Sequence, residues 1–174
     1  GTSIQRNHAD FDKLLLFDQI FGGGASGSMN SRLFALREQT GLFYTISGSL
    51  IVGSDEEPGM CIVKTIVSKD RLEEAKVVIK KTMNEVIDSI TTEELDRAKQ
   101  TIINSRVDNF ASNKSTASAF IAIDRFELGD DYFDKRADVI KDISLEEVKK
   151  AARKILNIEK MITLEIGRLG SEKQ

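Results

Sequence analysis

The stretch FGGGASGSMNSRLFALREQTGLFY, from Phe21 to Tyr44, decides how this chain can fold. It opens with three consecutive glycines, Gly22, Gly23 and Gly24. Glycine is the preferred residue after a helix because a left-handed backbone costs it little. We therefore expect a helix to end at Gly22, a tight turn to follow, and a second helix to occupy residues 29–39. Ser28 can cap that helix through its hydroxyl.

The same glycines match G-x-G-x-x-G from Gly22 to Gly27, the fingerprint of dinucleotide-binding loops. That site requires a strand before the glycines and an acidic residue about 20 residues later. Apolar residues at three-to-four spacing predict a helix over residues 9–21 instead, although Leu14–Phe17 alone could form a buried strand. No acid follows at the required distance, and Ser28 stands where a phosphate loop needs lysine. A structural loop is therefore favoured over a nucleotide site.

The remaining sequence predicts a single α+β domain over residues 1–174, with an antiparallel or mixed sheet and helices packed on one of its faces. Residues rich in β-branched side chains at 42–52 and 60–67, joined by an acidic turn, predict a hairpin. Residues 3–6 could end a further strand, and alternation at 161–167 predicts a closing strand. Capping boxes begin at Thr91 and Ser144. Helices are expected after Ser68 and at 92–110, 116–128, 132–142 and from 144 onward.

Composition excludes several classes of function. A net charge of about −3 gives no reason to expect nucleic acid or an acidic membrane as a partner. No apolar run approaches transmembrane length, so we expect a soluble protein. The single cysteine, Cys61, cannot form an internal disulfide and leaves the compartment undecided. In a bacterium, the cytoplasm and the periplasm both remain open.

The central stretch resembles the second domain of pitrilysin/insulinase-type zinc metallopeptidases, a group that includes mitochondrial processing peptidase. The similarity extends along almost the whole chain in matching order. The segments that carry it are Ile20–Gly24, Ser31–Phe34, Leu36–Glu38, Gly41–Tyr44, Gly129–Phe133, Ile143–Val148, Ala151–Leu156 and Met161–Gly167. The resemblance implies an α+β domain of this metallopeptidase type.

The zinc motif of that family, H-x-x-E-H, is missing from this sequence. His8 is the only histidine and is followed by Ala9, Asp10, Phe11 and Asp12. A catalytic zinc needs three protein ligands and one open position, which these residues do not supply. Cys61 lies in an apolar run and is expected to be a core thiol. We therefore expect no metal and no cofactor in this chain, and an inactive chain when isolated, with zinc bound by a partner domain.

The resemblance implies catalytic roles for Arg37 and Tyr44. A cationic donor and a phenol suit an amide carbonyl whose oxygen becomes negative during hydrolysis. If the chain folds back at Gly41, both side chains could converge on one point. From the residues alone, Arg37 could instead be a solvated arginine at a helix end. Tyr44 could then pack with its neighbours on one strand face.

Substrate contacts are further implied for Gly22, Gly23, Gly24 and Arg32. A tie between helix and sheet is the alternative role for Arg32. The chain is then expected to be the non-zinc half of a peptide-cleaving metalloendopeptidase, closing a clamshell over the substrate. Its partners would be a peptide and a zinc-motif domain, in the same polypeptide or in a separate subunit, with a homo-oligomer as a further option. The alternative function is a catalytically silent scaffold or assembly subunit, and a generic helical interaction domain is a third option.

Overall fold

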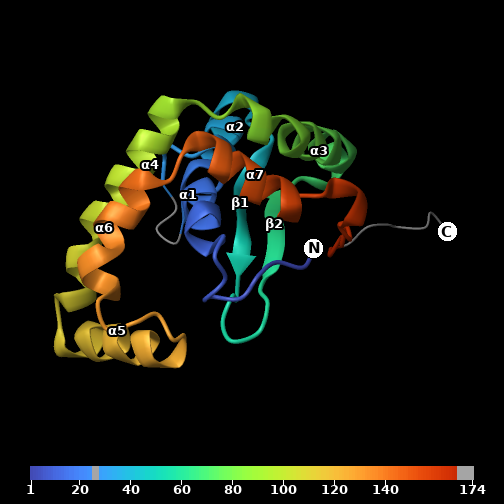
Figure 1. Ribbon diagram of the computed structural model, residues 1–174. Coiled ribbons are helices and arrows are strands. Elements are labelled where there is room, and N and C mark those ends of the chain that lie inside the picture. Colours follow the sequence, from blue (N-terminus) through green and yellow to red (C-terminus); the bar gives the residue numbers. More distant parts are fainter. Residues whose placement is uncertain (25–27, 168–174) are drawn as a thin grey trace.

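The computed structural model describes residues 1–24 and 28–167 and places helices around a two-stranded antiparallel sheet (Figure 1). This arrangement confirms the α+β class. The α-helices are α1 Phe11–Phe21, α2 Arg32–Thr40, α3 Leu72–Ser89, α4 Thr92–Asn104, α5 Asn113–Arg125, α6 Tyr132–Asp142 and α7 Leu145–Ile155. The strands are β1 Phe43–Val52 and β2 Met60–Val67, and the short 3₁₀ helices are η2 Lys69–Arg71, η3 Ser105–Phe110 and η4 Ile158–Lys160.

Helix α1 lies at the centre of the core. It contacts β1, and it also contacts α4 and α7. Its side chains are buried around most of its circumference, including Leu14, Leu16, Phe17, Ile20 and Phe21. This explains why Leu14–Phe17 reads as a continuous apolar run, since a helix enclosed by neighbours needs no polar stripe.

Strands β1 and β2 form the predicted hairpin. Gly48 pairs with Val63 near its middle, and Val52 pairs with Met60 near its turn. The first residues of the chain extend this sheet, because Gly1 and Cys61 exchange two backbone hydrogen bonds and Thr2 forms an isolated bridge to Met60. The strand end predicted at residues 3–6 is therefore a short pairing centred on Thr2, along the outer edge of β2.

The closing strand predicted at residues 161–167 is wrong. None of these residues is in a strand. Ile162, Leu164 and Ile166 have exposed fractions of 93%, 78% and 88%, so neither face of the segment is buried. Glu165 instead forms an ion pair with Lys76 of α3 at 2.7 Å. Alternation in sequence specifies a strand only when a neighbouring strand supplies the hydrogen bonds, and no such neighbour lies beside these described residues.

Side-chain caps fix most helix starts. The predicted capping boxes of Thr91 with Glu94 and of Ser144 with Glu147 are confirmed. The start of α2 differs from the prediction, because Ser31 rather than Ser28 accepts the capping hydrogen bond, from the backbone N–H of Phe34. Ser68 precedes the 3₁₀ helix η2 and makes no side-chain cap.

The region between α4 and α6 departs most from the predicted helices. The helix expected over 92–110 ends at Asn104 and continues as the 3₁₀ helix η3. Helix α5 begins at Asn113, three residues before the predicted start, because Ser112 and Ser115 form a third capping box. In the described ranges, no helix has both the length and the apolar character that a membrane crossing requires.

Candidate functional site

The glycine triplet is held directly against the sheet. A Cβ atom added to Gly22 would lie 1.8 Å from the carbonyl oxygen of Gly48 in β1. Gly22 ends α1 with φ −107°, so its left-handed backbone was wrongly predicted, and close approach is what requires glycine there. Gly23 and Gly24 have φ values of 88° and 63°, which do favour glycine. The last residues of the G-x-G-x-x-G pattern, 25–27, lie outside the described residues.

Asp18 joins the glycine triplet to β1, through its backbone carbonyl on one side and its buried carboxylate on the other. Asp18 of α1 is 2% exposed, and it accepts hydrogen bonds from the Leu50 backbone N–H at 2.7 Å and from the Ser49 hydroxyl. Its own carbonyl oxygen accepts from the N–H groups of Gly22 and Gly23. Burial raises the pKa of Asp18 to about 6, although the hydrogen bonds from Ser49 and Leu50 act in the opposite direction. The sequence alone did not predict a role for Asp18. The signal that could have indicated one is the position of an acidic residue within a largely apolar helix.

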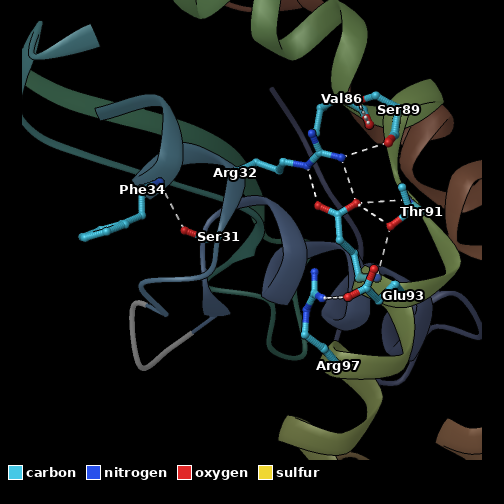
Figure 2. A network of polar contacts seen from close by, with 9 residues as sticks. Ser31, Arg32, Phe34, Val86, Ser89, Thr91, Glu93 and Arg97 are labelled. Carbon is cyan, nitrogen blue, oxygen red and sulfur yellow. Dashed lines mark hydrogen bonds and ion pairs between the residues drawn. The ribbon is translucent and has the colours of Figure 1, made fainter. Parts of the chain in front are cut away.

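Arg32 points away from the sheet and toward the junction of α3 and α4 (Figure 2). Its Nε lies 2.6 Å from one carboxylate oxygen of Glu94, and its Nη2 donates to the other at 2.8 Å. The same Nη2 donates to the carbonyl oxygen of Ser89 at 2.9 Å. Arg32 therefore ties α2 to the end of α3 and the start of α4, so the tie to the sheet that we considered is wrong.

Glu94 serves two purposes in that network. It accepts from the Thr91 backbone N–H as the capping residue of α4, and it pairs with Arg32 (Figure 2). Burial disfavours its charged form, but hydrogen bonds from Arg32 and Thr91 outweigh burial and lower the pKa of Glu94. The carboxylate thus stays ionised near neutral pH. The hydrogen bonds and the ion pair of the Arg32 guanidinium described here all lie within this junction.

Arg37 and Tyr44 do come together across the turn at Gly41. The Arg37 Nε donates to the backbone carbonyl oxygen of Tyr44 at 3.0 Å, and its Nη1 pairs with Glu38 at 2.7 Å. Gly41 makes this possible with a left-handed backbone at φ 55°. The guanidinium therefore meets the Tyr44 backbone, while the phenol ring is 76% exposed. Tyr44 is consequently not packed with its neighbours on one buried strand face.

The direction of the Tyr44 ring follows from an irregularity in β1. Phe43 pairs with Val67 and Thr45 pairs with Ile66, so Tyr44 is an extra residue that has no partner in β2. Such a β-bulge breaks the alternation of side chains and redirects the extra one. Tyr44 thereby faces solvent. Nothing in the sequence pattern signals this bulge.

The candidate residues therefore lie in three separate places. Arg37 and Tyr44 meet at one end of the hairpin, next to α2. The glycine triplet contacts β1 farther along, at Gly48, and Arg32 faces α4. Within residues 1–24 and 28–167, no hydrogen bond or ion pair joins Arg32 to Arg37 or Tyr44.

The available ligands do not fit a zinc site. Within the described ranges, no group of three His, Cys, Asp or Glu residues could hold a metal ion. His8 is exposed, and its Nδ1 accepts a hydrogen bond from the Asp10 N–H at 3.0 Å. Cys61 is buried as predicted, and burial raises the pKa of its thiol to about 11. A cysteine binds zinc as the thiolate, which the burial of Cys61 disfavours.

Solved structures share this fold over nearly the whole chain. A peptidase M16 inactive domain from Pseudomonas fluorescens is 25% identical with a TM-score of 0.79, over 91% of this chain and 37% of that one. A protease from Helicobacter pylori is 15% identical with a TM-score of 0.68, over 90% of this chain and 37% of that one. A candidate zinc protease from Bordetella pertussis is 20% identical with a TM-score of 0.68, over 91% and 85% of the two chains.

This chain accordingly spans little more than a third of the first two of those proteins. No curated protein matches its sequence. The family model described as "Peptidase M16 inactive domain" matches residues 2–102, which include α1, α2, the hairpin, α3 and most of α4. The match covers more than half of the 174 residues and contains every residue of the candidate site, and the chain therefore belongs to the peptidase M16 inactive domain family.

Proposed function

We propose that this chain is the non-zinc half of a peptide-cleaving zinc metalloendopeptidase and closes the substrate chamber of a partner domain that binds the metal. Membership of the inactive domain family supports the proposal that another domain binds the zinc. The absence of a fitting ligand set in the described residues supports it as well. The observation that carries the proposal is the exposed phenol of Tyr44 on a bulge at the end of the hairpin.

Tyr44 has the properties of a hydrogen-bond donor to a substrate. Its ring is 76% exposed, and no hydrogen bond to its hydroxyl is present among the described residues. A phenol O–H can donate to the carbonyl oxygen of a bound peptide. That oxygen gains negative charge during amide hydrolysis, so a donor already in position stabilises the transition state more than the ground state.

Arg37 acts through Tyr44 in this proposal. The hydrogen bond from its Nε to the Tyr44 carbonyl oxygen holds the extra residue of the bulge. The guanidinium also lies 5.9 Å from the centre of the Phe34 ring and pairs with Glu38. These contacts fix the arginine from two sides, so Arg37 is a positioning residue. Gly41 closes the turn between them without steric strain.

The proposal is tested by reconstitution with the zinc-motif domain that accompanies this chain in its natural source, whether in the same polypeptide or as a subunit. Cleavage of a quenched fluorescent peptide is measured for the zinc-motif domain alone, for this chain alone, and for the two together. We expect cleavage only from the combination, and we expect a chelator to abolish it. Full activity of the zinc-motif domain by itself would contradict the proposed role.

The scaffold alternative gives a different result in the same experiment. A scaffold would bind partners that carry no H-x-x-E-H motif, and adding it would leave peptide cleavage unchanged. Capture from the source organism with the tagged chain, followed by sequencing of bound proteins, distinguishes the two. Repeated recovery of proteins without the motif, and never of one with it, would favour the scaffold.

A further inference from the structure

A cavity lies between η3, α5 and α6 and shares no lining residue with the Arg37–Tyr44 site. Its volume is about 560 Å³, within the range typical of small-molecule sites. Its apolar lining residues are Leu15, Ile102, Ala119, Ala122, Leu128 and Phe133. Its polar lining residues include Arg6, Arg106, Lys114, Tyr132 and Arg136. We call it the arginine cavity.

The charge of the arginine cavity is unbalanced. Four of its lining residues are cationic, and no aspartate or glutamate lines it. Arg136 is neutralised by an ion pair with Asp12, which does not line the cavity. No ion pair to Arg6, Arg106 or Lys114 is present among the described residues, although the surface of this chain carries many such pairs. Positive charge gathered in a cleft with apolar walls attracts an anion.

Tyr132 lies close to two of these cations. The Arg136 guanidinium lies 4.9 Å from the centre of its ring, and the Arg6 guanidinium lies 5.7 Å from it. The Arg6 Nη2 donates to the Tyr132 hydroxyl at 2.7 Å. That hydroxyl already accepts a hydrogen bond, so its proton is free to be donated to a ligand oxygen.

Arg106 has one hydrogen-bond donor without a partner in the described structure. Its Nη2 donates to the carbonyl oxygen of Phe133, while its Nε is buried and has no hydrogen-bond partner in the described structure. A buried donor without a hydrogen-bond partner lowers the stability of the fold. A bound anion that accepts its hydrogen bond would offset this loss. Ser112 and Ser115 at the start of α5 also line the cavity, so the positive end of that helix adds to the field.

We propose that the arginine cavity binds a small organic carboxylate, with its two oxygens at the arginine and tyrosine donors and its apolar body against the apolar lining residues. The planar guanidinium matches the geometry of a carboxylate. The apolar lining distinguishes such a ligand from an inorganic anion. None of the lining residues belongs to the Arg37–Tyr44 site, so this proposal goes beyond the proposed function and does not depend on it.

The test is a titration of the isotope-labelled 174-residue chain followed by NMR. N-acetyl-leucine serves as the probe, N-acetyl-leucinamide as its neutral counterpart, and inorganic phosphate as an anion without an apolar body. We expect N-acetyl-leucine to cause saturable chemical-shift changes at the backbone amides of η3, α5 and α6. N-acetyl-leucinamide and phosphate should bind at least tenfold more weakly. Equal binding of the amide would overturn anion recognition, and equal or tighter binding of phosphate would overturn the organic ligand.

Two variants test which side chains donate hydrogen bonds to the bound carboxylate. Tyr132→Phe removes one hydroxyl and keeps the ring, and Arg106→Gln removes one charge. We expect each to weaken N-acetyl-leucine binding about tenfold, as the loss of a charge-assisted hydrogen bond does. Arg71→Gln, an exposed arginine on η2, is the matched control and should bind normally. If Arg106→Gln does not fold, Lys114→Gln on the exposed start of α5 replaces it. Unchanged affinity in folded Tyr132→Phe and in the charge variant would overturn the site.

A last comparison identifies the source of the carboxylate. The peptide Ala-Ala-Leu is titrated with a free and with an amidated C-terminus. Binding of the free form alone assigns the cavity to peptide C-termini. Binding of N-acetyl-leucine but of neither peptide assigns it to free organic acids. Binding of both peptides with equal affinity would contradict carboxylate recognition.

Discussion

The side chain of Arg37 is hydrogen-bonded to the backbone of Tyr44, with 3.0 Å between its Nε and the carbonyl oxygen. This contact joins the last turn of α2 to the bulged start of β1. It leaves the Tyr44 phenol exposed and free of protein partners among the described residues. The two residues are therefore not equivalent donors, because the arginine sets the position of the backbone from which the tyrosine projects.

Replacing Tyr44 with phenylalanine tests its catalytic role in the reconstituted enzyme. The change removes one hydroxyl, and we expect kcat to fall about 10²–10³-fold with a smaller change in KM, because the lost bond strengthens in the transition state. Steady-state kinetics on a quenched peptide measures both constants. Thr45→Val, which removes the neighbouring hydroxyl, is the matched control. A stable Tyr44→Phe enzyme with normal turnover would show that Tyr44 is not catalytic.

Arg37→Lys tests whether the arginine acts through Tyr44. Lysine keeps the charge but loses the planar fork, so we expect it to restore little of the activity lost in Arg37→Ala. The effect on kcat should largely disappear when Tyr44→Phe is already present, since both changes interrupt the same interaction. A double-mutant cycle with melting temperatures measured alongside provides the result. If the effects of the two substitutions on kcat are fully additive, Arg37 contributes to catalysis independently of Tyr44.

Gly22→Ala should destabilise the fold through steric overlap. Its Cβ would lie 1.8 Å from the Gly48 carbonyl oxygen, so α1 and β1 would have to separate. We expect a loss of about 3 kcal/mol or more in the free energy of unfolding. Gly41→Ala is the comparison, because that Cβ meets nothing within 4 Å and carries only the cost of a left-handed backbone, about 1 kcal/mol. Urea denaturation measures both, and equal losses would show that close approach at Gly22 is unimportant.

Asp18 should make stability depend on pH. Its pKa is raised to about 6 from an ordinary value of 3.8, so the folded state retains a proton that the unfolded state has released. The stabilisation from this proton is complete below about pH 4 and is lost as the pH rises through 6. Asp18→Asn cannot titrate and should lack this slope. Urea denaturation of both proteins between pH 4 and 8 tests this, and parallel stability curves would contradict the raised pKa.

The isolated chain should not bind zinc. We expect elemental analysis after dialysis against zinc to show no stoichiometric metal, because His8 and Cys61 cannot form a site together with the carboxylates. A chelator should leave its melting temperature unchanged. Tight zinc binding in a one-to-one ratio, combined with chelator-sensitive peptide cleavage by this chain alone, would refute both the ligand argument and the proposed division of labour.

Local signals in the sequence determined much of the architecture. The hairpin of β1 and β2, the capping boxes at Thr91 and Ser144 and the span of α6 were all predicted, because each depends on residues within a few positions of one another. The core role of Cys61 also followed from its apolar neighbours. The Peptidase M16 relationship was accessible for the same reason, since the resemblance rests on short segments of the sequence.

Contacts between distant residues were decided only by the tertiary structure. Arg32 pairs with Glu94, 62 positions away, and Gly22 is required by the backbone of Gly48 rather than by its own conformation. The bulge at Tyr44 depends on the register of the opposite strand. Residues 161–167 alternate like a strand but have no strand beside them to pair with. The physical reason is common to all four, because the energy of each contact depends on a partner whose position the local sequence does not specify.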